Sequence, residues 1–409
     1  MSGKNLIGPK AEKIINKTKK FCIDTTYAYP FVIRTGESCY LEDMDGNVFL
    51  DFNSNVCSCA VGYGHPEIMG VLREYTTLGA HKIAGQDFYT EEQAELAEKI
   101  VKITPRNLKR VLLVNSGAEA VENAIKFAYR KKGPLAGVSC IGAFHGRTLG
   151  ALSFTDSKAV QKKNYPEVNN ELIKFCTDDK DLDINQLEEL IKRESEPAFV
   201  IAECIQGEGG YRPGSKKFIK NLRKVTSKHH IPLIIDEIQS GVGRTGKWWS
   251  FQHYGIKPDI MTAAKALQVG AVVSTKEYDP RDPGAVSSTW GGGHRIDMAI
   301  GLKTIEIIEK EKLLKNAQNM GNYFMKWLNE LKEKYPNIII DVRGLGLMIG
   351  VEFSNAKDRD KIVQEAFKNG LLLLGCGFNV LRIAPPLNIT KVEVDHGLSI
   401  IDKLLQNLR

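Results

Sequence analysis

The chain has 409 residues, of which 43% are hydrophobic and 26% charged, so its composition is that of an ordinary globular protein rather than a fibrous or disordered one. This length exceeds the size at which a single core stops growing, and we therefore expect two domains. The chain has a net charge of +7, but its basic residues are interspersed with acidic ones, as in the segment 91–99. This pattern disfavours a nucleic-acid partner and indicates a mildly basic surface.

The eight cysteines contain no CxxC pair and no zinc-ligand spacing, so we expect no metal site. The N-terminal residues lack the apolar region of a signal peptide, and no stretch approaches the roughly 20 apolar residues that a membrane helix needs. We therefore expect a cytoplasmic protein that contacts neither nucleic acid nor a membrane.

Residues 30–52 carry short strand-like runs, and Asp45-Gly46 supplies a hairpin turn, which predicts a small sheet near the N-terminus. From about residue 66 to residue 270, helical periodicity alternates with short apolar runs. The runs are residues 110–114, 137–141, 198–202 and 232–236. This alternation predicts an α/β fold, in which helices cover both faces of a parallel sheet.

The C-terminal third begins after a glycine-rich loop at 291–293. Residues 296–334 have the periodicity of one long amphipathic helix, short strands follow it, and the final segment again has helical spacing. These features predict a second α/β unit. We expect an N-terminal segment 1–62 that contributes to a small domain, a large domain 63–300 and a C-terminal small domain 301–409.

Two glycine-rich stretches imitate nucleotide-binding loops. Gly241–Lys247 has most of the P-loop spacing, but Trp248 occupies the position where a magnesium-binding Ser or Thr is required. Gly344–Gly350 approximates a dinucleotide loop, but its last glycine comes one residue late and a strand pattern follows it. We therefore expect no nucleotide site, and we interpret the second stretch as a bend in a strand.

Polar side chains that could carry chemistry follow several of the apolar runs. Ser116 and Glu119 fit a capping box at a helix start that could receive a phosphate, although an ordinary cap explains them equally well. Asp236 ends an apolar run, at the edge where α/β sheets bind ligands. Lys265 follows another run among small residues, a setting that can make the amine nucleophilic, although most such lysines lie on the surface.

Five segments, in order, resemble the class III aminotransferases, the group that includes 4-aminobutyrate, ornithine, acetylornithine and lysine 6-aminotransferases. The segments are Asn115–Lys126, Phe144–Thr148, Glu203–Gly210, Asp236–Gly246 and Pro258–Lys265. Residues 40–52 and 342–350 extend the resemblance over nearly the whole chain. The resemblance implies the aspartate-aminotransferase-like fold type I, with a large cofactor-binding domain built on a mostly parallel sheet and a small α/β domain.

The resemblance also implies a site for pyridoxal 5′-phosphate. Lys265 would carry the cofactor as a Schiff base and move the substrate proton, Asp236 would pair with the pyridinium nitrogen, and Gln239 would bond the phenolic oxygen. The residues expected to hold the phosphate or the ring are Ser116, Gly117, Ala118, Phe144, His145 and Thr289. In this family the threonine reaches the cofactor of the neighbouring subunit, so a dimer or larger assembly with shared sites is expected.

Two of these ring contacts have simpler alternatives. Phe144 would stack on the ring, but a core phenylalanine is a fair alternative. His145 is expected to orient its loop without acting as an acid or base.

Five further residues match positions that contact substrate in this family. Arg147 would grip a carboxylate, Val56 would line the substrate entrance, and Glu203 lies in the same motif as Glu208. Glu208 and Arg382 would form a switch that closes for an ω-amine and opens for the α-carboxylate of 2-oxoglutarate. A static ion pair between domains is the alternative for these two residues.

The resemblance predicts a transaminase that moves the ω-amino group of 4-aminobutyrate or a similar amino acid to 2-oxoglutarate, giving a semialdehyde and glutamate. Lysine 6-, ornithine or acetylornithine aminotransferase, or an amino acid racemase or epimerase, are the alternatives. Ala266 stands where family members usually carry a glycine, and a TrpGlyGlyGly run follows Thr289. These departures resemble the lysine 6-aminotransferase branch and leave the donor open.

Overall fold

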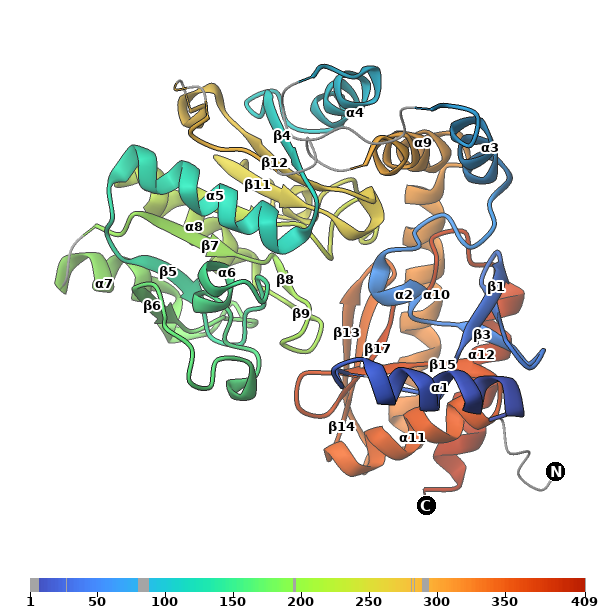
Figure 1. Ribbon diagram of the computed structural model, residues 1–409. Coiled ribbons are helices and arrows are strands. Elements are labelled where there is room, and N and C mark those ends of the chain that lie inside the picture. Colours follow the sequence, from blue (N-terminus) through green and yellow to red (C-terminus); the bar gives the residue numbers. More distant parts are fainter. Residues whose placement is uncertain are drawn as a thin grey trace.

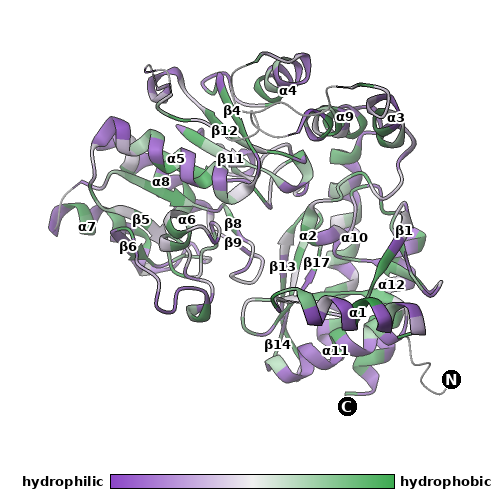
Figure 2. Cartoon of the chain, in the orientation of Figure 1, coloured by the Kyte–Doolittle hydropathy of each residue, from purple (hydrophilic) through white to green (hydrophobic). Residues whose placement is uncertain are grey.

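A computed structural model describes residues 7–26, 28–79, 88–193, 196–280, 282, 284–288 and 294–408. The chain forms two lobes, and both ends of the chain lie in the same lobe (Figure 1). The hydropathy colouring shows hydrophobic strands inside each lobe and helices with one hydrophilic side (Figure 2). In the part of the chain that is described, no helix is both long and apolar enough to cross a bilayer.

A seven-stranded sheet in the order β4-β12-β11-β10-β7-β5-β6 forms the centre of one lobe. Its strands are β4 (Arg110–Val114), β5 (Gly137–Cys140), β6 (Asn170–Ile173), β7 (Phe199–Ala202), β10 (Leu233–Asp236), β11 (Ile260–Ala263) and β12 (Gly270–Ser274). β12 runs antiparallel to both of its neighbours, whereas the other pairs are parallel. The four apolar runs in the sequence correspond to β4, β5, β7 and β10, so the predicted α/β fold class is confirmed.

Successive residues of β10 face opposite layers of helices, as the two-residue period of a strand requires. Leu233 and Ile235 lie in the hydrophobic core that contains Leu222 of α8 (Lys216–Lys228). Ile234 lies in the core that contains Ala124 of α5 (Gly117–Lys132). Helices therefore cover both faces of this sheet (Figure 1).

Shorter elements complete this lobe and join it to the other. The helices are α3 (Pro66–Tyr75), α4 (Glu91–Lys102), α6 (Leu149–Ser153), α7 (Gln186–Arg193) and α9 (Arg295–Lys310). The 3₁₀ turns are η1 (Ala159–Gln161), η2 (Leu182–Asn185), η3 (Ser250–His253), η4 (Lys265–Leu267) and η5 (Lys276–Tyr278). A two-stranded ribbon pairs β8 (Ile205–Gln206) with β9 (Arg212–Pro213).

The second lobe contains two four-stranded sheets. One sheet joins β1 (Ile33–Glu37), β2 (Tyr40–Asp43) and β3 (Val48–Asp51) to β15 (Leu371–Leu372), and the other has the order β13 (Ile339–Leu345), β14 (Met348–Phe353), β17 (Val380–Ile383) and β16 (Leu374–Cys376). Its helices are α1 (Pro9–Phe21), α2 (Ser54–Cys57), α10 (Leu313–Lys334), α11 (Ala356–Lys368) and α12 (Lys391–Gln406). Because β15 pairs with β3, both ends of the chain build one lobe. The domain boundaries at residues 62 and 300 stay a prediction.

The prediction of one long helix over residues 296–334 is wrong. The chain forms α9 and α10, and between them Lys312 adopts a left-handed conformation with φ 56°. Apolar residues on both sides of the break, such as Ile308 and Leu313, are buried in the same core. The hydrophobic period therefore continues across a single left-handed residue that periodicity does not reveal.

Both glycine-rich stretches hold turns, and the second, which was expected to bend a strand, lies where β13 turns into β14. Gly346, with φ 56°, lies in the hairpin between β13 and β14, and Gly344 sits near the end of β13. The stretch Gly241–Lys247 forms turns in which the buried Arg244 donates to the carbonyls of Leu347 and Pro385.

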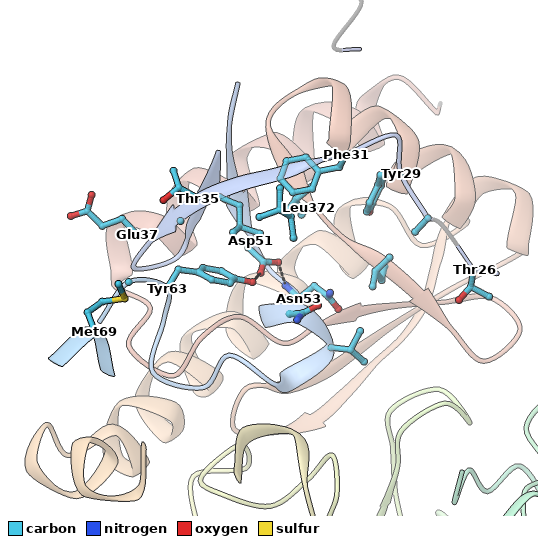
Figure 3. A pocket seen from close by; sticks show the side chains of 18 residues that line it. Thr26, Tyr29, Phe31, Thr35, Glu37, Asp51, Asn53, Tyr63, Met69 and Leu372 are labelled. Carbon is cyan, nitrogen blue, oxygen red and sulfur yellow. Dashed lines mark hydrogen bonds between the residues drawn. The ribbon is translucent and has the colours of Figure 1, made fainter. Parts of the chain in front are cut away.

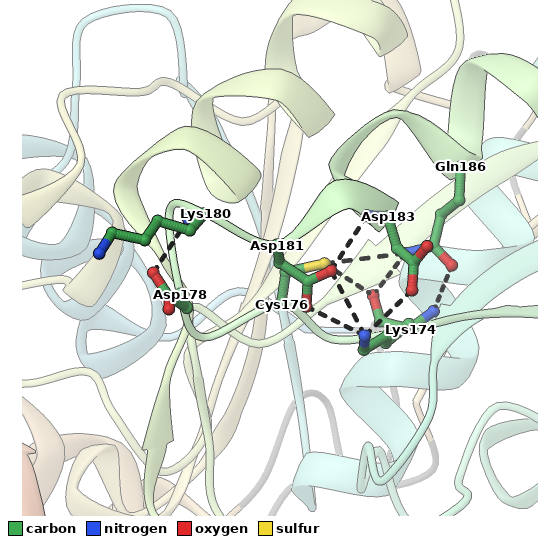
Figure 4. A network of polar contacts seen from close by, with 7 residues as sticks. All are labelled: Lys174, Cys176, Asp178, Lys180, Asp181, Asp183 and Gln186. Atoms are coloured by element: carbon green, nitrogen blue, oxygen red, sulfur yellow. Dashed lines mark hydrogen bonds and ion pairs between the residues drawn. The ribbon is translucent and has the colours of Figure 1, made fainter.

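A surface network ties β6 to the segment that precedes α7 (Figure 4). Lys174 Nζ lies 3.1 Å from Asp181 and 3.0 Å from Asp183, and the Gln186 amide bonds both backbone groups of Lys174. Exposed ion pairs of this kind contribute little to stability. We therefore assign this network a local structural role.

Candidate active site

A cavity of about 620 Å³ opens at the carboxyl ends of β4, β10 and β11. Ten residues that the sequence singled out line it together: Ser116, Gly117, Ala118, Phe144, His145, Arg147, Glu203, Asp236, Gln239 and Lys265. Open α/β sheets bind ligands at this edge, so the location agrees with a ligand site. Among the described residues, no cluster of side chains has the composition of a metal site.

Lys265 lies two residues after the end of β11 and begins η4. Its φ of 51° is left-handed, which is uncommon for a residue other than glycine and indicates a backbone held in place by its surroundings. Ala264 and Ala266 on either side are buried. Burial lowers the pKa of the Lys265 amine, so its neutral, nucleophilic form is more accessible than that of a surface lysine.

Asp236 ends β10 and is buried with its carboxylate almost fully engaged. One oxygen lies 2.8 Å from Nδ1 of His145, and the other accepts from the Ile238 N–H at 3.0 Å and the Thr262 hydroxyl at 3.2 Å. A carboxylate has about four acceptor positions, so one remains for a further donor. Within the described chain, the buried Nε2 of His145 has no hydrogen-bond partner. His145 therefore orients Asp236, and the remaining acceptor position fits a pyridinium N–H.

The N-terminus of α5 fits a phosphate. Ser116 is the N-cap, and its hydroxyl accepts from the Glu119 N–H at 3.2 Å. The capping box differs from the prediction, because the Glu119 carboxylate accepts from the N–H of Asn115 at 2.8 Å instead of that of Ser116. A methyl group at Gly117 would come within 3.0 Å of Ile238, so the chain is closely packed there. The first N–H groups of the helix, including that of Ala118, lack intrahelical partners and can bind an anion.

Thr289, the residue expected from a neighbouring subunit, lies outside the described residues. The nearby Ser288 is described and buried, and its hydroxyl accepts from the Asn115 side chain at 2.8 Å. The segment that leads to Thr289 is thus attached to the start of the phosphate loop.

Replacing Ser116 with alanine is expected to weaken cofactor binding and to cost about 1 kcal/mol of stability through loss of the cap. Ser215→Ala is a matched control, because Ser215 caps α8 in the same way by accepting from the Phe218 N–H at 3.1 Å. The temperature of thermal unfolding, measured without cofactor, should fall by a similar amount in both variants. Titration with pyridoxal phosphate should show weaker binding in Ser116→Ala alone, and equal affinities would contradict a phosphate site at α5.

Glu203 is buried beneath the loop that carries Phe144. One of its oxygens accepts from the Phe144 N–H at 3.0 Å and the other from the Gly207 N–H at 2.9 Å. Burial raises the pKa of the carboxyl from 4.5 to about 7. The carboxyl group fixes the position of Phe144 in the cavity wall, while its predicted contact with substrate stays a prediction.

The raised pKa of Glu203 has a consequence for stability. The folded protein holds this proton between pH 4.5 and about 7, where the unfolded chain has lost it, so this contribution to stability is full below pH 4.5 and is lost progressively as the pH rises to about 7. The carboxyl should account for up to about 3 kcal/mol of this decrease. Measured by thermal unfolding across this range, Glu203→Gln should reduce the pH dependence. An unchanged slope would show that another group is responsible.

Glu208 and Arg382 form a mostly buried ion pair, with Arg382 Nη1 2.7 Å from Glu208 Oε1. Burial alone would raise the pKa of Glu208, but the charges of Arg382 and Lys265 lower it below its ordinary value. Arg382 Nη2 also donates to the Gly375 carbonyl at 3.1 Å. The pair is therefore closed and ionised, in the electrostatic neighbourhood of Lys265.

Arg147 and Val56 occupy different environments. Arg147 is exposed at the cavity, and no hydrogen bond or ion pair holds its guanidinium within the described parts of the chain. Val56 does not line the Lys265 cavity but a neighbouring one of about 720 Å³, which also contains the Tyr63 hydroxyl bonded to Asp51 at 2.6 Å (Figure 3). The structure thus places Val56 outside the wall of the Lys265 cavity, and Glu208 and Arg382 are likewise not among the residues that line it.

Sequence reasoning missed several residues of the Lys265 cavity. Ile238 lies inside the segment Asp236–Gly246, two residues after Asp236, and this position could have indicated that it lines the cavity. Ser58 and Gln268 gave none, because they meet only in the folded chain, where Gln268 Nε2 donates to the Ser58 carbonyl at 2.9 Å.

A cofactor with three features would fit this cavity. Its phosphate would bind the N-terminus of α5, its basic ring nitrogen would bind Asp236, and its electrophilic carbon would react with the Lys265 amine. The α/β fold and this cavity define an enzyme that depends on pyridoxal phosphate, which supplies the electron sink when bound.

Comparison with known proteins narrows this class. The profile of the family "Aminotransferase class-III" matches residues 23–405. The chain is 37% identical to an acetylornithine aminotransferase of Archaeoglobus fulgidus, over 95% of this chain and 99% of that protein. It is also 35% identical to an alanine/serine racemase of Pyrococcus horikoshii, over 98% of this chain and 91% of that protein. The chain belongs to the class III aminotransferases, so it takes an amino donor and an oxo-acid acceptor.

Two further similarities concern proteins with other stated donors. A 5-aminovalerate aminotransferase of Pseudomonas putida is 35% identical over 92% of this chain and 93% of its own length. The structure of a lysine aminotransferase from M. tuberculosis in the internal aldimine form superposes with a TM-score of 0.91 at 26% identity, covering 98% of this chain and 100% of that chain. Class III similarity thus covers nearly the whole chain, and the similar proteins are named for several different amino donors.

Proposed function

We propose that the protein transfers the ω-amino group of a carboxylate-bearing donor, foremost N-acetylornithine, to 2-oxoglutarate. The closed Glu208–Arg382 pair, in the electrostatic neighbourhood of Lys265, is the observation that carries this proposal. Closed, the pair presents no net charge to an ω-amine. When the pair opens, the guanidinium of Arg382 can bind the α-carboxylate of 2-oxoglutarate through two parallel hydrogen bonds. One pocket can thus serve two unlike substrates in turn.

The choice of donor departs from 4-aminobutyrate, which the resemblance favoured. The Archaeoglobus relative is an acetylornithine aminotransferase, and a second enzyme of that name, from Caldanaerobacter subterraneus, is 33% identical over 97% of this chain. N-acetylornithine and 4-aminobutyrate each have a carboxylate for Arg147 and no second free ammonium group. We therefore retain 4-aminobutyrate as the next donor to test.

In the proposed mechanism, Arg147 binds the donor carboxylate and so directs the ω-amine toward Lys265. The Lys265 amine, with its lowered pKa, takes a proton from the ω-carbon of the donor and later returns one to the α-carbon that becomes glutamate. Asp236, oriented by His145, would accept a hydrogen bond from the ring nitrogen of the cofactor. Phe144 covers one face of the site and excludes water.

A racemase or epimerase is the second candidate, because the Pyrococcus relative is an alanine/serine racemase. Such an enzyme reprotonates the α-carbon from the opposite side and needs no amino acceptor. It has no use for an arginine switch that admits a second carboxylate. The Glu208–Arg382 pair therefore favours transamination.

We also propose a cytoplasmic homodimer in which Thr289 completes the phosphate site of the neighbouring subunit. Sedimentation analysis of the parent protein gives the assembly state. Thr289→Ala variants should form the same assembly and bind pyridoxal phosphate more weakly, whereas a fully active monomer would contradict the shared site.

The donor is tested with the cofactor-loaded protein and single amino acids, followed by absorbance. The panel is N-acetylornithine, 4-aminobutyrate, 5-aminovalerate, ornithine, lysine and both enantiomers of alanine. We expect N-acetylornithine to convert the cofactor fastest and 2-oxoglutarate to restore its spectrum. If no donor converts the cofactor while alanine loses optical purity, the protein is a racemase.

A further inference from the structure

Three side chains meet beside the Lys265 cavity: the buried Tyr211 and Cys57, and Gln239, which lines the cavity. Gln239 Nε2 donates to the Tyr211 hydroxyl at 3.3 Å, and this hydroxyl lies 3.5 Å from Cys57 Sγ. We propose that Tyr211, supported by Cys57, is a positioning residue that holds the Gln239 amide with its nitrogen available to the bound cofactor. This inference rests on the proposed assignment of Gln239 to the phenolic oxygen, and not on the identity of the amino donor.

The surroundings of Gln239 fix which end of its amide points where. A methyl group at Gly207 would lie only 1.8 Å from Gln239 Oε1, so the amide oxygen occupies the space beside this glycine. The amide nitrogen carries two hydrogens, and Tyr211 receives one of them. The amide nitrogen also lies 3.9 Å from Cys57 Sγ, which is a weak acceptor. A stronger oxygen acceptor bound in the cavity that Gln239 lines would replace the sulfur as the partner of this second hydrogen.

Tyr211 suits this task because its hydroxyl remains protonated. The side chain is fully buried, and burial raises the pKa of the phenol well above its usual range. A neutral hydroxyl accepts one hydrogen bond from Gln239 and can donate its own proton to Cys57. If the amide were turned around, its oxygen would accept from the hydroxyl, and the amide would offer an acceptor on this side instead of a donor. The observed bond from the amide nitrogen to Tyr211 thus keeps the donor end of the amide on the side of the hydroxyl.

The backbone of both supporting residues is held in an unfavourable conformation. Tyr211 has φ 48°, and Cys57, with φ 68°, ends a run of four left-handed residues over Ser54–Cys57. For bulky residues this region is rarely occupied, and it costs roughly 1–2 kcal/mol for each residue. Backbone strain that persists at a ligand site indicates that the resulting side-chain positions are required there.

Specific contacts maintain the left-handed turn. Ser54 Oγ donates to the Ala384 carbonyl at 2.6 Å and accepts from the buried Arg244 at 3.1 Å. At the start of the turn, the Asp51 carboxylate accepts from the Asn53 N–H at 2.7 Å. These bonds anchor the turn to the β17 end of the second lobe and bring Cys57 to Tyr211.

The test compares Tyr211→Phe, Cys57→Ala, Gln239→Leu and the Tyr211→Phe/Gln239→Leu double variant, all loaded with pyridoxal phosphate. Tyr254→Phe is the matched control, because it removes another buried hydroxyl that donates to a backbone carbonyl, that of Cys204 at 3.1 Å. The readouts are the pH at which the absorbance of the bound cofactor changes and the cofactor dissociation constant.

Loss of a donor to the phenolic oxygen makes that oxygen more basic, so the proton shared with the Lys265 nitrogen is held to higher pH. We expect Tyr211→Phe to raise the spectral midpoint by about 0.5–1 pH unit and to weaken cofactor binding about 3–10-fold. Gln239→Leu should raise the spectral midpoint at least as far. Cys57→Ala should raise it by a smaller amount. The double variant should equal Gln239→Leu, because Tyr211 acts through Gln239. Tyr254→Phe should leave the midpoint unchanged.

The proposal would be overturned if Tyr211→Phe shifted the spectral midpoint as far in the Gln239→Leu variant as in the parent. It would also be overturned if Gln239→Leu shifted the midpoint and Tyr211→Phe did not. If Tyr211→Phe does not fold, Cys57→Ala alone and combined with Gln239→Leu decides the same question. Absence of any shift with Gln239→Leu would overturn both the role of Gln239 and this inference. None of these results depends on which donor reacts, so transamination is judged separately by the donor panel.

Discussion

Replacement of Lys265 with alanine is expected to abolish amino transfer while pyridoxal phosphate still binds noncovalently. The other anchors, Asp236 and the start of α5, do not depend on the amine. Loss of the proton-transfer group and of covalent attachment together should lower kcat by about 10⁴-fold or more. Single-turnover absorbance with the preferred donor measures this loss.

Lys276→Ala is the control for this experiment, because Lys276 is an exposed lysine at the start of η5. It should retain full activity. Borohydride reduction of the parent followed by peptide mass spectrometry should locate the cofactor on Lys265 and on no other lysine. Covalent label elsewhere, or substantial turnover by Lys265→Ala, would contradict the assignment.

The second large effect is expected from Glu208→Gln. Removing one partner of a buried ion pair leaves the other charge uncompensated, which typically costs ~3–5 kcal/mol. In the proposed mechanism the donor half-reaction needs the closed pair, so it should slow by about 100-fold or more. The 2-oxoglutarate half-reaction would use the freed Arg382 and should change much less. Stopped-flow absorbance with each substrate alone separates the two half-reactions.

The Glu208→Gln/Arg382→Leu double variant gives the opposite pattern, since it restores an uncharged wall but removes the guanidinium. Donor turnover should recover, while kcat/KM for 2-oxoglutarate should fall about 10–100-fold. Glu92→Gln, which breaks the pair with Arg295 at 2.8 Å outside the cavity, should lower stability without changing the ratio of half-reactions. An equal loss in both half-reactions of Glu208→Gln would indicate a static ion pair.

The fold could be predicted largely because buried strands leave a clear mark in the sequence. The four apolar runs became β4, β5, β7 and β10. The antiparallel direction of β12 was not predictable, because strand direction depends on a short return through Lys265 and Gln268 that carries no local signal. The break at Lys312 was hidden for a similar reason, since a single left-handed residue leaves the apolar period unchanged.

The cofactor site was predictable where its residues lie in short contiguous motifs. Asp236 and Gln239 share one motif, and the α5 cap lies in another. Tyr211 and Cys57 could not be assigned, because their contact joins positions 154 residues apart through two left-handed backbone segments. Val56 was assigned to the substrate entrance but lines a neighbouring cavity, since the left-handed turn determines where it points.

The central claim, that this chain transfers an ω-amino group through Lys265, is tested most directly with a donor isotopically labelled at its ω-nitrogen. The parent protein is incubated with labelled N-acetylornithine and unlabelled 2-oxoglutarate, and the glutamate formed is examined by mass spectrometry. We predict labelled glutamate in an amount equal to the donor consumed, and none with Lys265→Ala. Glutamate without label, or racemised substrate with no glutamate, would contradict it.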